Sequence, residues 1–80
     1  MPLTGYQTTR FYDAANDRDS IRIDGFSGRG VYFVTRALVP PGKSRRAQLD
    51  EALDLIEDAI DAGAAPGEVN GVFGKTGEWR

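Results

Sequence analysis

The residues most suggestive of chemistry lie between Ala37 and Ser44, which follow the phosphate-loop pattern: a small residue, four free positions and then Gly-Lys-Ser. In such loops, successive backbone N–H groups hold the phosphates at the start of a helix. Pro40 and Pro41 occupy two of the four free positions and have no N–H to donate. We therefore expect a strand end, a turn and a helix start here, with Ser44 as the helix N-cap.

Other catalytic chemistry has little support in the composition. The 80 residues include no cysteine and no histidine, which excludes disulfides, thiol nucleophiles, Cys/His zinc sites and imidazole acid–base catalysis. Asn16, Asp17 and Asp19 share one turn, but this turn lacks the glycine and the terminal glutamate of a calcium-binding EF-hand loop. Paired carboxylates lie on an expected exposed helix face, where burial cannot tune them for catalysis. We therefore expect no enzyme, no cofactor and no metal.

Side-chain patterns predict a single small α+β domain over residues 1–80, in which a three-stranded sheet packs on one helix. Strand-favouring residues cluster in three segments, and the short connections between them require antiparallel pairing. We expect these strands at about 4–13, 20–26 and 30–39. A C-terminal arm, 66–80, could add a short fourth strand.

One amphipathic helix is expected over about 45–62, with Ser44 and Gly63 as its caps. Its apolar side chains recur every three or four residues, so they would form one stripe against the sheet. That stripe consists of Leu49, Leu53, Ile56 and Ile60, flanked by Ala52 and Ala59.

The far side of the expected helix carries the most unusual feature, a cluster of acidic residues. A helix dipole favours acids near the start and bases near the end, whereas Arg45 and Arg46 lie in the first turn here and acids lie in the last turns. Like charges at i,i+4 also repel one another, so local helix stability does not account for this face. It is either a solvated, solubilising surface or a docking surface for a protein with a basic surface, such as a nucleic-acid-handling complex. The residues expected to make that contact are Asp50, Asp54, Glu57, Asp58 and Asp61.

Charge is divided unevenly along the chain. Residues 1–46 carry eight basic and four acidic side chains, a net charge of +4, whereas residues 47–80 carry two basic and eight acidic side chains, a net charge of −6. Two halves of opposite sign offer complementary surfaces for the pairing of two copies, so a homodimer is one expected state.

The basic half also suggests an alternative function, direct nucleic-acid binding by an open sheet face that carries Arg and Tyr side chains. We expect Val31 and Phe33 to face the helix, which turns Tyr32 and Arg36 toward solvent together with Arg22. The candidate nucleic-acid-binding residues are Arg10, Arg22, Tyr32, Arg36, Lys43, Arg45 and Arg46.

The sequence favours a cytoplasmic location. It contains no run of about 18 apolar residues that could span a membrane. The first residues, MPLTGYQTTRFYD, lack the basic and apolar regions of a secretory signal. The absence of cysteine also fits a reducing compartment.

Residues 30–60 resemble HicB-like antitoxin domains, which place a Gly-aromatic strand, a Pro-Gly turn and a Glu-Ala-Leu helix in the same order. The likeness is carried by Gly30, Tyr32, Phe33, Pro41, Gly42, Glu51, Ala52 and Leu53. This resemblance implies that the protein binds and neutralises a small toxin ribonuclease.

The whole chain is also similar in size, composition and charge layout to small phage-encoded proteins directed against host defences, anti-CRISPR proteins above all. That resemblance implies a non-enzymatic, stoichiometric inhibitor in the cytoplasm of a bacterial host. Such an inhibitor would occupy a nucleic-acid-binding surface of a CRISPR effector complex, and the acidic side of the helix would make the contact.

Overall fold

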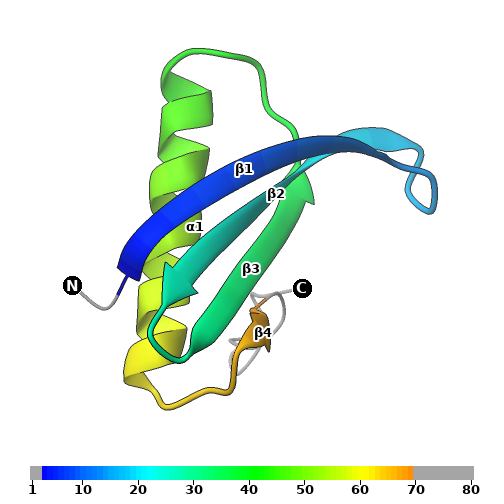
Figure 1. The fold of residues 1–80 in the computed structure, drawn as a ribbon. Helices are drawn as coiled ribbons and strands as arrows, with labels where there is room; N and C mark the ends of the chain where they lie inside the picture. Colours follow the sequence, from blue (N-terminus) through cyan, green and yellow to red (C-terminus); the bar gives the residue numbers. More distant parts are fainter. Residues whose placement is uncertain (1–2, 70–80) are drawn as a thin grey trace.

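The computed structural model describes residues 3–69, which form a four-stranded sheet covered on one face by a single helix (Figure 1). In chain order the elements are β1 (Leu3–Asp13), β2 (Arg18–Ser27), β3 (Gly30–Ala37), α1 (Lys43–Asp61) and β4 (Gly67–Glu68). The strands lie in the order β1-β2-β3-β4, with the first three antiparallel and β4 parallel to β3. The predicted α+β fold is confirmed, including the short fourth strand.

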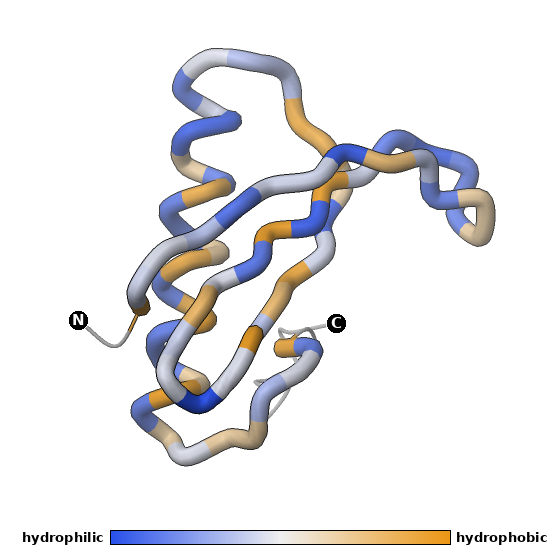
Figure 2. Tube along the Cα trace, in the orientation of Figure 1, coloured by the Kyte–Doolittle hydropathy of each residue, from blue (hydrophilic) through white to orange (hydrophobic). Residues whose placement is uncertain are grey.

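The helix does not cover the sheet evenly. It packs on β2 and β3, while β1 lies at the sheet edge, and the end of the β1–β2 hairpin projects well away from the helix (Figure 1). Hydropathy follows the same division, since apolar residues gather in β2, β3 and one side of α1 while β1 is largely polar (Figure 2). The face of the sheet turned toward α1 is called the inner face below, and the opposite face the outer face.

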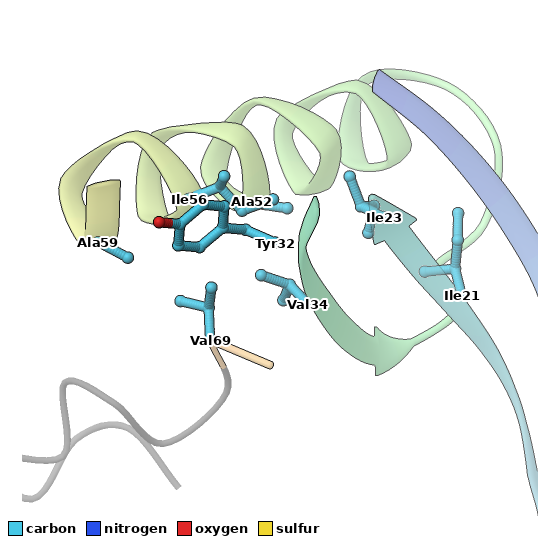
Figure 3. Packing of buried hydrophobic residues seen from close by; sticks show 8 residues of the cluster. All are labelled: Ile21, Ile23, Tyr32, Val34, Ala52, Ile56, Ala59 and Val69. Atoms are coloured by element: carbon cyan, nitrogen blue, oxygen red, sulfur yellow. The ribbon is translucent and has the colours of Figure 1, made fainter. Parts of the chain in front are cut away.

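The core lies between the inner face and α1 (Figure 3). The expectation that Val31 and Phe33 face the helix is wrong. Tyr32 and Val34 are fully buried instead, while Val31 is 41% exposed. The buried apolar residues are Ile21, Ile23, Tyr32, Val34, Ala52, Ile56, Ala59 and Val69.

Pairing with β2 explains why Tyr32 faces inward. Tyr32 lies opposite Gly25, and a Cβ added to Gly25 would come within 3.0 Å of Ile56, so the missing side chain makes room for the helix. The Tyr32 hydroxyl donates a hydrogen bond of 2.7 Å to the carbonyl oxygen of Ala64, just after α1. The ring is therefore buried without leaving its polar atom unpaired.

The start of the helix differs from the prediction and its end agrees with it. Helix α1 begins at Lys43 with Gly42 as N-cap, and no side chain caps it, so Ser44 lies in the first turn instead of before it. At the other end, Gly63 adopts φ 83°, and the N–H of Ala64 donates to the carbonyl of Ala59. This is the Schellman arrangement, in which a glycine accepts the left-handed conformation without strain.

Residues on the inner side of α1 fit the predicted apolar stripe, with one shift. Ala52, Ile56 and Ala59 are the buried residues of the helix, whereas Leu49, Leu53 and Ile60 are partly buried at the margin. The two alanines let the helix approach the sheet closely. No helix within residues 3–69 is long and apolar enough to cross a membrane.

The turn between β1 and β2 is organised by Asp13. Its carboxylate accepts hydrogen bonds from the side-chain amide of Asn16 at 2.7 Å and from the backbone N–H groups of Ala15 and Asn16 at 3.1 and 3.3 Å. These bonds, the side-chain bond above all, lower the pKa of the Asp13 carboxyl below its ordinary value. Asn16 and Asp17, which lacked an EF-hand pattern, therefore lie in the hairpin turn, whereas Asp19 lies in β2 opposite Tyr12.

Candidate functional site

A groove runs between the edge strand β1 and the helix α1, with a volume of about 570 Å³. It exists because α1 packs on β2 and β3, which leaves the inner face of β1 uncovered. We call it the edge groove. Its lining residues are Leu3, Thr4, Gly5 and Tyr6 of β1 and Asp50, Leu53, Asp54 and Glu57 of α1.

The two walls of the edge groove differ in chemistry. The helix wall presents three carboxylates, those of Asp50, Asp54 and Glu57, above the apolar side chain of Leu53. The strand wall presents Tyr6, which is 52% exposed. Carboxylates beside an exposed aromatic ring and an apolar floor suit a ligand that is cationic and partly apolar, such as an arginine or lysine side chain of a protein.

The five predicted partner-binding acids form a continuous surface, called the acidic face below. Asp50, Asp54, Asp58 and Asp61 are exposed, and Glu57 is half-buried in the groove wall. None of the five has an ion-pair partner among the described residues, since the ion pair found there joins Arg22 to Asp24. The acidic face therefore presents its charge to solvent.

The alternative set of residues is not brought together on one face. Ile21 of β2 pairs with Arg10 of β1 on one side and with Arg36 of β3 on the other. Directly paired residues share one face of the sheet, so both arginines lie on the inner face with Ile21. Arg22 is one residue along β2 and points to the outer face. Tyr32 is fully buried and cannot stack on a base. The open Arg/Tyr sheet face expected from the sequence is therefore not formed.

Arg22 and Arg36 each have partners within the protein. The Nε of Arg22 lies 2.8 Å from the Asp24 carboxylate, and its guanidinium lies 3.8 Å from the centre of the Phe33 ring. Arg36 donates to the carbonyl of Thr35 at 2.9 Å. Partial burial lowers the pKa of Arg36, and the nearby Glu51 carboxylate opposes that effect.

The basic residues at the start of α1 are divided between structure and solvent. Arg45 donates from Nε to the carbonyl of Val39 at 2.8 Å, which ties the first helical turn to the start of the loop that follows β3. Lys43 and Arg46 are exposed beside a shallow hollow of about 510 Å³ that also reaches Asp50. The segment thus has the predicted role of a turn and a helix start.

The sequence pattern indicates the acids of the edge groove but not the residues of its other wall. Leu3, Thr4 and Tyr6 belong to a strand that was predicted correctly, but the pattern of a strand does not indicate which side of a sheet it occupies. No cluster of three or more acidic side chains that could hold a metal ion occurs within residues 3–69. Residues 70–80 of the predicted C-terminal arm lie outside the described residues.

Comparisons of the chain with protein-family models, with curated proteins and with solved structures find no match.

Proposed function

We propose that this protein is a non-enzymatic binding module whose acidic face docks on the basic surface of a nucleic-acid-handling protein and blocks that surface. The observation that carries the proposal is the acidic face itself: four exposed carboxylates and one half-buried carboxylate on one helix, none of them with an ion-pair partner among the described residues. The phage-type inhibitor suggested by the size and charge of the chain is the form of this function that we favour.

Electrostatics supports a role in recognition. Residues four apart on a helix have Cβ atoms about 5–6 Å apart, which is within the Debye length of about 8 Å at physiological ionic strength. Salt therefore screens neighbouring carboxylates only weakly from one another, and their negative potentials add. The pairs at this spacing are Asp50/Asp54, Asp54/Asp58 and Glu57/Asp61. Such a field accelerates encounter with a basic surface and competes with the phosphates that the surface normally binds.

The fold supports the same role. Helix α1 is held on its inner side by Ala52, Ile56 and Ala59, and its end is fixed by the Schellman arrangement. The carboxylates are thus displayed on a rigid element, so little conformational entropy is lost when a partner binds. The edge groove adds an apolar floor and Tyr6 beside the acids, which supplies contact area beyond charge.

The test uses two matched baits. Asp54→Lys/Asp61→Lys reverses two charges on the acidic face, and Asp17→Lys/Asp19→Lys makes the same change in net charge at the hairpin end. The first pair of substitutions is the helix variant and the second is the hairpin variant. Candidate partners are proteins from host extract that bind the wild type and the hairpin variant but do not bind the helix variant. A purified candidate should then release its labelled nucleic acid when the wild-type protein is added.

We expect the helix variant to bind the purified partner at least about tenfold more weakly, because two attractions become repulsions. Equal capture by the helix and hairpin variants would refute the proposal. So would a ternary complex, in which the partner retains its nucleic acid while bound to this protein.

A further inference from the structure

Strand β1 lies at the edge of the sheet, and most of its residues are exposed. The strand is 11 residues long, and within residues 3–69 it has a neighbouring strand on one side only. Sheet edges are usually protected by proline, by charged side chains such as lysine, by short length or by strong bulges, because unpaired N–H and C=O groups bind other strands. Strand β1 carries one charge on its inner face, Arg10. Residues 3–13 contain neither proline nor lysine, and the one register shift is confined to the Leu3/Gly5 end.

We propose that two copies of this chain pair antiparallel along β1, forming a continuous sheet in which Arg10 of each copy enters the edge groove of the other. This goes beyond the docking function above and does not depend on it, but both use the edge groove, so dimerisation and docking compete for Asp50, Asp54 and Glu57. We choose a second copy as the partner because β1 carries a cation, Arg10, and the groove carries carboxylates. These groups meet when two copies of β1 pair over their whole length.

That register follows from the strand itself. The central residue of Leu3–Asp13 is Thr8, so full overlap of two antiparallel copies places Thr8 opposite Thr8 on the two-fold axis. Tyr6 then lies opposite Arg10 of the second copy. Directly opposed residues share one face of the sheet, and Tyr6 is on the inner face because it pairs with Gly25, which touches Ile56.

Charge complementarity selects this arrangement. Tyr6 lines the edge groove together with Asp50, Asp54 and Glu57, so a guanidinium placed beside Tyr6 meets both an aromatic ring and a carboxylate wall. In its own chain, Arg10 is exposed and lies beyond the groove. The two-fold axis makes this contact twice, and it places both helices on the same side of the joined sheet.

The first experiment measures mass by sedimentation equilibrium from about 5 to 500 μM, the range in which modest self-association appears. We expect a reversible dimer. Arg10→Glu should weaken dimerisation at least about tenfold, since it places a carboxylate against three others. Arg10→Glu/Asp54→Lys should recover most of the loss. Arg29→Glu, an equal charge change in the β2–β3 turn, should leave the dimer intact.

The second experiment reads the register directly. The chain has no cysteine, so Thr8→Cys introduces a unique thiol that meets its symmetry mate across the axis and should form a disulfide dimer under mild oxidation. Thr9→Cys is the matched control, because it lies on the outer face and its symmetry mate is a diagonal neighbour, roughly 7–8 Å away. It should cross-link much more slowly.

Several results would overturn the proposal. A monomer at every concentration would exclude the dimer. Equal effects of Arg10→Glu and Arg29→Glu would exclude the groove contact, and faster cross-linking of Thr9→Cys than of Thr8→Cys would exclude the register. Because positions 8, 9 and 10 are exposed in the single chain, circular dichroism should report an unchanged fold for each variant. A dimer that survives all of these changes would place the interface elsewhere.

Discussion

Removing the hydroxyl of Tyr32 tests whether this residue is a core residue, as the fold requires, or a surface residue, as the sequence pattern suggested. The ring is fully buried and its hydroxyl donates a hydrogen bond of 2.7 Å to Ala64. Tyr32→Phe keeps the ring and leaves the Ala64 carbonyl without this donor. We expect a loss of about 1–2 kcal/mol in the free energy of unfolding, the cost of one partly buried hydrogen bond and its unpaired acceptor.

The assay is urea unfolding followed by circular dichroism, with thermal unfolding as a second measurement. For a domain of 60–100 residues, each 1 kcal/mol corresponds to a decrease in Tm of about 4–8 °C. A total stability of about 4–12 kcal/mol for this length makes the effect easily measurable. Tyr6→Phe is the matched control, because Tyr6 is 52% exposed, and its stability should change by less than about 0.5 kcal/mol.

The outcome separates the two placements of the ring clearly. If Tyr32→Phe and Tyr6→Phe have the same small effect, the Tyr32 hydroxyl does not lie against Ala64 and the inward orientation of β3 is wrong. Tyr32 and Arg36 would then lie on the outer face with Arg22, and that face would regain its aromatic residue. If Tyr32→Phe alone destabilises, that face has no base-stacking tyrosine.

Three further predictions follow from the described contacts. Gly25→Ala should destabilise by about 1–3 kcal/mol in urea unfolding, because the new Cβ would lie 3.0 Å from Ile56 in a closely packed core. Ser44→Ala should change stability by less than about 0.5 kcal/mol, whereas Gly63→Ala should cost about 1 kcal/mol, because Ser44 caps nothing and Gly63 has a φ of 83°. An NMR titration should show that the pKa of the Asp13 carboxyl lies below its ordinary value of 3.8. The stabilisation of the turn by Asp13 is then complete above pH 3.8 and is lost as the pH falls through the lower folded-state pKa. An unshifted titration would contradict the hydrogen bonds to Asn16.

Local chemistry made the elements of this fold predictable. The turn residues around Asp13–Arg18, the prolines after β3 and the glycine after α1 each have one dominant conformational role, so the three main strands and the helix were predicted within a few residues. The helix is 3.6-periodic, so its acidic and apolar sides were separated correctly as well. Its N-terminus was misplaced because Ser44 is a favourable cap by residue type, but the chain turns at Gly42.

The orientation of β3 was not predictable from its own residues. In VYFVTRA, apolar residues occupy both alternating sets, so the period of two does not choose between Val31 with Phe33 and Tyr32 with Val34. Pairing decides it: Tyr32 lies opposite Gly25 and Val34 opposite Ile23, which places the larger ring where β2 leaves space beneath the helix. The space for the Tyr32 ring is therefore formed by β2 and α1, and the residues of β3 alone do not reveal it.

The sequence by itself determined the charge of the helix, the extended conformation of β1 and the absence of thiol and imidazole chemistry, because these depend on residue type and near neighbours. Tertiary structure decided the site. The edge groove exists because α1 lies over β2 and β3 and leaves β1 open, which brings Tyr6 beside Asp50 and Asp54 across more than 40 residues of chain. Contacts at that separation depend on how the helix is seated on the sheet, and no local pattern encodes that placement.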